Sequence, residues 1–180
     1  MADWVVTIGG TPRTVVAESL NWDDQLNARA TLSFQIISAL AGYRPVDGES
    51  VTLTDGDGNV VFGGRLVEPS EERLYGGDNL THLLHHCAAV SNDALADKAV
   101  VAAVYAAQTL QAIVQDIVVN SVPSLASEGV TAVDYVEVGP TLTIAFNYKY
   151  ANECFNELCE FAGLAWWIDP AFKLHVQSRA

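Results

Sequence analysis

Residues 51–67 read Val-Thr-Leu-Thr-Asp-Gly-Asp-Gly-Asn-Val-Val-Phe-Gly-Gly-Arg-Leu-Val, and this stretch decides the fold class. Val51 and Leu53 alternate with threonines, which is the two-residue period of a half-buried strand. A cluster of Asp, Gly and Asn residues, the types that tight turns require, then reverses the chain. After the turn, three apolar residues share one face of a second strand: Val60, Phe62 and Leu66. The stretch therefore predicts a β-hairpin.

A third half-buried strand precedes the hairpin. Its apolar residues are Ala28, Ala30, Leu32, Phe34 and Ile36, and they alternate with Arg29, Thr31, Ser33 and Gln35. Further turn signals occur at residues 9–10, 47–48 and 76–79. Half-buried strands in series favour a small antiparallel barrel or sandwich over a parallel sheet covered by helices. We expect Leu32, Phe34 and Phe62 to share its core.

The composition excludes several functional classes. The chain of 180 residues has nine Lys and Arg residues and 22 Asp and Glu residues, so its net charge is −13. This charge repels a phosphate backbone and argues against sequence-specific nucleic-acid binding. The uncharged run from Ala99 to Gln115 contains polar residues and is shorter than the roughly 20 apolar residues of a membrane span. The N-terminus lacks the basic and apolar regions of a secretory signal, so we expect synthesis in the cytoplasm.

The second half of the chain shows helical periods, and we place a domain boundary near residue 88. The predicted domains are an antiparallel β-barrel over 1–88 and an α+β domain over 89–180. An apolar stripe predicts a helix that follows an N-cap at Thr109 and ends before Pro123; it comprises Leu110, Ile113, Val114, Ile117 and Val118. A strand is expected over 141–146.

A second helix is predicted over 151–162, ending at Gly163, and a C-terminal hairpin turns at Asp169-Pro170. Cys154 and Cys159 lie on the apolar stripe of this helix, so we interpret them as core residues, and the odd cysteine count, completed by Cys87, fits a reducing compartment. We expect one shared second core: Leu110, Ile113, Phe155, Leu158 and Trp166.

The sequence His82-x-x-His85-His86-Cys87 is the best candidate for a metal site, because imidazole and thiolate are the preferred ligands of zinc. On a strand, however, His82 and His86 point to one face while His85 and Cys87 point to the other. A structural or interface strand is therefore favoured. Asp55-Gly56-Asp57-Gly58-Asn59 imitates the start of a calcium loop, but Val60 and Leu66 occupy the positions of the required Gly and Glu, so a plain hairpin turn is favoured.

Catalytic signals are sparse. Glu71-Glu72 is interpreted as a solvated face, and the usual nucleophile-elbow, zinc-helix and phosphate-loop motifs do not occur. Trp166 and Trp167 are adjacent in a predicted strand and face opposite ways, so we assign one to the core and the other to an interface or surface. The sequence therefore predicts no catalytic residue, no metal and no cofactor.

The ordered motifs of the chain resemble those of hub proteins at the tail tip or baseplate of tailed bacteriophages, which are related to the hub part of type VI secretion spikes. The motifs span nearly the whole chain: Gly48-x-x-Val51-x-Leu53-x-Asp55, Phe62-Gly63-Gly64-x-Leu66, Cys87, Ala94-Leu95-Ala96-Asp97-Lys98, Tyr105-x-x-x-Thr109, Ile113-Val114, Phe146-Asn147-Tyr148, Glu157-Leu158-Cys159, Gly163-x-x-Trp166-x-Ile168-Asp169 and Lys173-Leu174-x-Val176.

This resemblance implies a barrel similar to a tail-tube subunit, followed by an α+β domain, in a structural virion protein that joins the tail tube to the tip. It implies a ring, a trimer, that contacts tail-tube or distal tail proteins and a tip or spike protein, and through which DNA passes without specific binding. Family members carry two such barrels, whereas this sequence has one. It is therefore either the N-terminal part of a longer hub or a single-barrel protein, and we favour the first interpretation. Phe62, Gly63, Gly64 and Trp167 are candidate assembly residues.

Two other functions remain open. In the first, the chain is a non-catalytic N-terminal module of a tail-associated peptidoglycan hydrolase. In the second, it is a small cytosolic metalloenzyme that uses His82, His85, His86 and Cys87.

Overall fold

The computed structural model describes residues 4–24, 29–74, 82–130, 132–136 and 140–178. The chain divides into two compact units, residues 1–91 and 92–180. Residue 88, near which the sequence predicts a boundary, lies inside the last strand of the first unit, β7 (His82–Ser91). The α+β class is confirmed in its coarse form, since strands predominate and helices are few.

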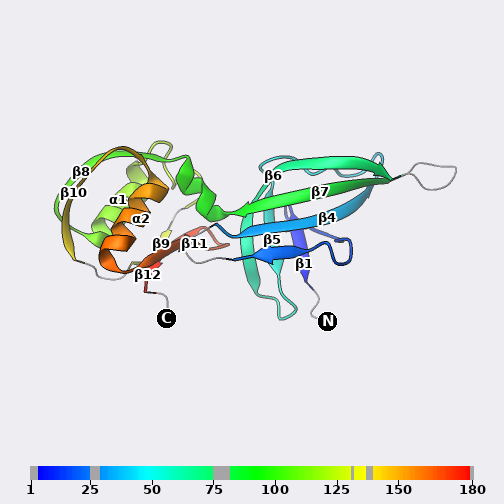
Figure 1. Cartoon of the computed structure of the whole chain (residues 1–180), viewed down its shortest axis with the longest axis horizontal. Helices are drawn as coiled ribbons and strands as arrows, with labels where there is room; N and C mark the ends of the chain where they lie inside the picture. The colour runs from blue at the N-terminus through cyan, green and yellow to red at the C-terminus, as the bar shows by residue number, and fades with distance from the viewer. Residues whose placement is uncertain (1–3, 25–28, 75–81, 131, 137–139, 179–180) are drawn as a thin grey trace. The chain divides into compact units, whose positions relative to one another are not determined.

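The first unit is one curled antiparallel sheet of seven strands (Figure 1). Its spatial order is β2-β1-β5-β6-β7-β4-β3. The strands other than β7 are β1 (Val5–Ile8), β2 (Thr11–Arg13), β3 (Asn21–Asp23), β4 (Thr31–Ala39), β5 (Ser50–Thr54) and β6 (Val60–Leu74).

The hairpin predicted over residues 51–67 is β5–β6, with Leu53 opposite Phe62 and Val51 opposite Gly64. The prediction that Val60 shares the buried face is wrong, because the register shifts after Leu53 and Val60 is 47% exposed beside the turn. The predicted third strand is β4, although Ala28 and the turn predicted at 76–79 lie outside the described residues.

The core of this unit lies on one face of the curled sheet. Leu32, Phe34 and Phe62 are buried in one cluster, as predicted. The other buried members are Val6, Ile8, Ile36, Val51, Leu53, Leu66, Cys87 and Ala89. Because alternate residues of five strands contribute to it, the two-residue period of the sequence accounts for the core.

The chain that follows the edge strand β2 reaches β4 near the opposite edge of the sheet. Val15 bridges Ile36, and the Val16 N–H donates to the Gln35 carbonyl oxygen over 2.8 Å. The Gln35 N–H in turn donates to Ser19 Oγ over 3.0 Å. The structure thus has a curled sheet, joined near its two edges by a short bridge, where the sequence predicts a barrel.

The second unit packs two helices against two small sheets (Figure 1). It begins with the 3₁₀ helix η1 (Asn92–Asp97), followed by β8 (Val100–Thr109), α1 (Leu110–Asn120), β9 (Ala132–Val136), β10 (Thr141–Tyr150), α2 (Ala151–Ala162), β11 (Ala165–Ile168) and β12 (Lys173–Gln177). β8 and β10 form a two-stranded antiparallel ribbon that curves around the helices, and β11-β12-β9 form the other sheet.

Both predicted helices are confirmed. Thr109 caps α1 by accepting the Ala112 N–H on Oγ1 over 3.2 Å. Gly163 ends α2 in the left-handed conformation, at φ 68°. The predicted second core is confirmed for Leu110, Ile113, Phe155 and Leu158, which are buried in one cluster against which Trp166 packs. Within the described residues, no helix has the length and apolar character needed to span a membrane.

Two strands of this unit were not predicted. The uncharged run 99–115 forms β8 and the first half of α1. β9 pairs in parallel with β12, so the predicted C-terminal hairpin, β11–β12, is part of a three-stranded sheet.

Candidate functional site

The histidines of β7 lie on two faces of the strand, as predicted. His82 and His86 are on the exposed face, whereas His85 and Cys87 are buried. In the part of the chain that the structure describes, no three His, Cys, Asp or Glu side chains come together to hold a metal ion. The four candidate ligands are therefore not brought to one point.

His85 instead joins three neighbouring strands. Its Nε2 is 2.7 Å from Ser38 Oγ of β4, and its Nδ1 is 3.9 Å from Glu71 Oε2 of β6. Glu71 Oε1 is 3.4 Å from Arg44, which is exposed. His85 itself is only 2% exposed, and burial lowers its pKa, an effect that the nearby Glu71 carboxylate partly opposes. The imidazole is therefore neutral near pH 7.

This arrangement places a serine, a histidine and a glutamate in the order of a hydrolase triad. The distance of 3.9 Å from Nδ1 to the carboxylate is, however, too long for a hydrogen bond. Buried polar groups are normally paired, and Ser38 supplies the partner that His85 needs. We interpret the pair as a polar contact between β4 and β7. No pattern within one strand indicates it, because it depends on the pairing of Ser38 with Leu83, which lies two residues before His85 on the same face of β7.

The acidic turn is a structural turn. Asp55 Oδ1 accepts the backbone N–H groups of Asp57 and Asn59 over 3.0 and 2.8 Å, and Asp55 Oδ2 accepts Asn59 Nδ2 over 3.1 Å. These hydrogen bonds lower the pKa of Asp55, and the bond from the Asn59 side chain contributes most to the shift. Both carboxylate oxygens are used within the hairpin, which agrees with the preferred interpretation of this segment.

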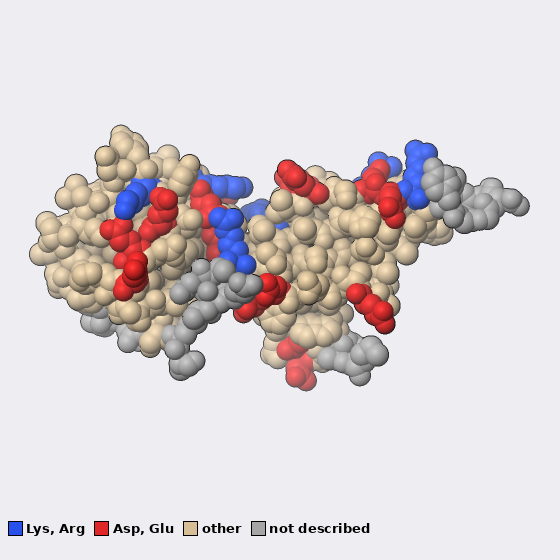
Figure 2. Space-filling model, viewed as in Figure 1, with Lys and Arg blue, Asp and Glu red and all other residues tan. Residues whose placement is uncertain are grey.

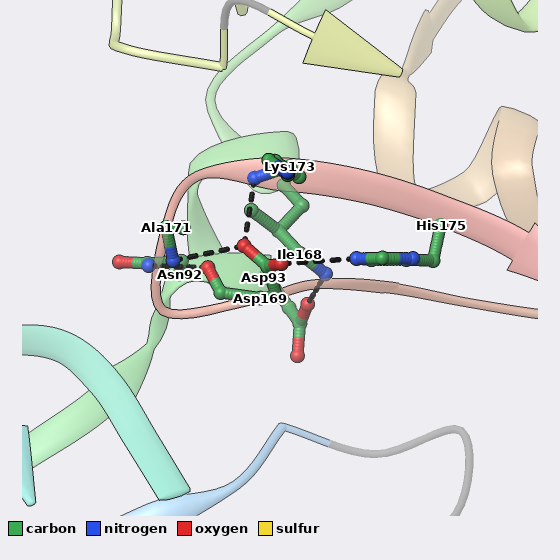
Figure 3. Close-up of polar contacts among 7 residues, drawn as sticks. All are labelled: Asn92, Asp93, Ile168, Asp169, Ala171, Lys173 and His175. Atoms are coloured by element: carbon green, nitrogen blue, oxygen red, sulfur yellow. Dashed lines mark hydrogen bonds and ion pairs between the residues drawn. The ribbon is translucent and has the colours of Figure 1, made fainter. Parts of the chain in front are cut away.

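A second polar cluster ties the β11–β12 hairpin to the start of η1 (Figure 3). Asp169 Oδ1 accepts the backbone N–H groups of Ala171 and Lys173 over 2.8 and 2.9 Å, and Oδ2 is 3.0 Å from His175 Nε2. Asn92 Nδ2 donates to the Asp169 carbonyl oxygen over 3.0 Å, and the Ile168 N–H donates to Asp93.

Burial raises the pKa of the Asp169 carboxyl, but the hydrogen bonds from His175, Lys173 and Ala171 outweigh burial and hold that pKa below its ordinary value. Asp169 is therefore a charged anchor of the hairpin near neutral pH. Only the Asp169-Pro170 turn was evident from the sequence.

The two adjacent tryptophans have different surroundings. Trp166 packs 5.1 Å from Phe155, centroid to centroid, and its Nε1 donates to Asn156 over 2.7 Å. Trp167 is half-buried and stacks on His175 at 5.0 Å with an interplanar angle of 7°. Trp166 is half-buried as well, and it packs against the second core, which agrees with the assignment of one tryptophan to the core side. Contact of Trp167 with another chain stays a prediction.

Phe62, Gly63 and Gly64 are buried within the first unit. A Cβ atom on Gly64 would lie 2.0 Å from the Val90 carbonyl oxygen, so β7 of the same chain already makes use of this glycine. The predicted role of the three residues in assembly is not tested by a single chain. Glu71 and Glu72 are partly solvated, as expected, with 41% and 59% of their side chains exposed.

Acidic side chains outnumber basic ones and occur on the visible faces of both units (Figure 2). A strongly acidic surface does not attract nucleic acid.

The fold is that of bacteriophage tail proteins and of a related secretion-system component. The sequence matches no protein-family model and no curated protein. Among solved structures, the 43 kDa tail protein of prophage MuSo2 from Shewanella oneidensis matches with a TM-score of 0.73 and 17% identity, over 100% of this chain and 56% of its own. A tail protein from Neisseria meningitidis MC58 matches with a TM-score of 0.66 and 16% identity, over 97% of this chain and 51% of its own.

The E. coli c3393 protein matches with a TM-score of 0.62 and 15% identity, over 95% of this chain and 48% of its own. It is a type VI secretion component with structural similarity to the bacteriophage T4 tail proteins gp27 and gp5. The resemblance to tail-hub proteins expected from the motifs is thus confirmed at the level of fold. The chain spans about half the length of these structures.

Proposed function

We propose that this chain is a structural component of a phage tail, part of the hub or baseplate that joins the tail tube to the tip. The observation that carries the proposal is the extent of the likeness: three proteins of phage tails or a tail-related secretion machine share the fold over 95–100% of this chain. In this role the protein acts by assembly and has no catalytic function. Its place is the tail of the virion, after synthesis in the host cytoplasm.

The first unit supplies the wall of the channel. Its curled sheet and the Val15–Ile36 bridge are the features expected of a tube-like barrel. Copies of the chain form a ring, a trimer, in contact with tail-tube or distal tail proteins on one side and a tip or spike protein on the other. The net charge of −13 leaves DNA mobile in such a channel, because the wall offers little cationic surface for phosphate to bind.

Native mass spectrometry and electron microscopy of the product of the complete reading frame test this proposal. The expected result is a closed ring, and antibodies to this chain should label one end of intact tails. A strictly monomeric product, or labelling of the capsid, would contradict it. The complete reading frame also decides the peptidoglycan-hydrolase alternative, because a hydrolase domain would lie in sequence beyond these residues.

A further inference from the structure

The ribbon of β8 and β10 has an open edge along β8. At its first residue the edge is paired: the Val100 N–H donates to the Val122 carbonyl oxygen and the Val122 N–H donates to that of Val100, each over 2.9 Å. Backbone groups of a strand alternate between its two edges, so Ala102 and Val104 also direct their N–H and C=O groups away from β10. Within the described residues, Val100 alone is bridged on that edge.

A groove of 510 Å³ lies between β8 and α1. Its lining residues are Ala103, Val104, Tyr105, Ala106, Gln108, Ala112 and Asp116. Asp116 is the charged member, and both its oxygens are bonded within the unit, Oδ2 to Tyr105 over 2.7 Å and Oδ1 to Asn120 over 2.6 Å. Natural proteins usually protect such edges with charges or proline. β8 has neither, and Val104 is 79% exposed.

β10 offers a matching edge. Among the described strands it pairs only with β8, and its length of ten residues equals that of β8. Ala145 lies opposite Val104, in a position whose backbone groups point away from β8 by the same alternation. Lys149 is the only charged residue of β10, and it is already paired with Glu157 of α2 in the same chain, so the edge carries little free charge.

We propose that the open edge of β8 binds the open edge of β10 from a second copy of this chain. Copies of a chain with a net charge of −13 repel one another, and these two strands combine exposed backbone donors and acceptors with almost no charge. An edge that pairs with a different edge gives a head-to-tail contact, which forms a ring when the rotation between copies closes and a filament when it does not, whereas pairing of β8 with β8 stops at a dimer. The inference rests on the proposed ring and names the contact that builds it.

Val104→Pro tests this contact, because it removes the open-edge N–H while leaving the bonds between β8 and β10 in place. The matched control is Val104→Thr, which keeps that N–H. We expect the dissociation constant of the oligomer, measured by native mass spectrometry, to rise about tenfold for the proline variant and to change little for the threonine variant. An oligomer that is unaffected by Val104→Pro would overturn this contact and leave the ring intact. A monomeric parent chain would overturn the ring and this contact together.

Cross-linking identifies the partner strand even if the proline variant does not fold. The native thiols are buried, and burial raises the pKa of Cys87 to about 11 and those of Cys154 and Cys159 to about 12, so a new surface cysteine is the reactive one. A mixture of Ala102→Cys and Ala145→Cys chains, treated with a short bis-maleimide, should give the cross-linked mixed dimer. Cross-linked Ala102→Cys homodimers alone, or no cross-linked species from an oligomeric sample, would overturn the proposal.

Discussion

Gly64 of β6 lies so close to Val90 of β7 that a Cβ atom would come within 2.0 Å of the Val90 carbonyl oxygen and 2.9 Å of the Phe62 ring. Gly64→Ala should therefore force the two strands apart and lower the free energy of unfolding by about 1–3 kcal/mol. Urea denaturation measures the change. Val67→Ala, at an exposed site on the same strand, is the control and should change stability by less than about 0.5 kcal/mol. Equal stability of Gly64→Ala and the parent would show that β6 and β7 separate at no cost.

Leu158 anchors α2 in the second core, where it is 0% exposed. Leu158→Ala should lower the free energy of unfolding by about 2–5 kcal/mol, because a cavity remains in packed surroundings. Phe161→Ala on the same helix is the control, since Phe161 is 66% exposed and its truncation leaves no cavity. If the two variants have the same denaturation midpoint, the buried face of α2 has been misassigned.

The parts of the fold that were predicted correctly depend on local chemistry. The apolar period of three to four residues, the Thr109 cap and the Gly163 terminus determine the helices, and each operates within a few neighbouring residues. β5–β6 was predictable because a short turn sets the pairing of its strands. The residues of β8 and β9 pair with residues about 30 to 50 positions away in sequence, and a single sequence carries no signal of such pairing.

The same limit applies to the polar clusters. The alternation along β7 correctly separated the His85 face from the His86 face, because it follows from the two-residue period alone. The partner of His85, Ser38, comes from a strand 47 residues earlier in the sequence, and only the register of β4 against β7 brings the two together.

Stability should depend on pH through His85. Its pKa in the folded state lies below the ordinary 6.5, because burial disfavours the charged form. The unfolded chain therefore binds the proton more tightly, so the contribution of His85 is complete above pH 6.5 and is lost as the pH falls through 6.5 toward the folded pKa. His85→Gln should reduce this acid sensitivity, measured from urea midpoints between about pH 7.5 and about pH 5. His86→Gln is the control at the exposed face, and an equal loss of pH dependence in both variants would argue against His85.

Asp169 should be the strongest polar anchor of the C-terminal hairpin. Its carboxylate accepts two backbone N–H groups and contacts His175, so Asp169→Ala should lower the free energy of unfolding by about 1.5–3 kcal/mol. Thermal denaturation at neutral pH measures the loss. Because the folded pKa of Asp169 is depressed, this contribution is present above the ordinary value of 3.8 and is lost as the pH falls below it. Asp57→Ala, an exposed turn residue, should be near neutral, and a comparable loss there would contradict a specific role for Asp169.

The protein should bind neither zinc nor calcium stoichiometrically. His85 and Cys87 lie on the buried face of β7 while His82 and His86 lie on the other, and Asp55 uses both carboxylate oxygens within its own turn. Elemental analysis of protein purified without a His-tag should therefore find substoichiometric metal. A chelator should leave the melting temperature unchanged, because only the removal of a structural metal would lower the free energy of folding that the metal contributes. Two variants separate the candidate sites, His86→Ala for zinc and Asp57→Ala for calcium. A large drop in melting temperature with chelator, restored by zinc and abolished in His86→Ala, would instead support the metalloenzyme alternative.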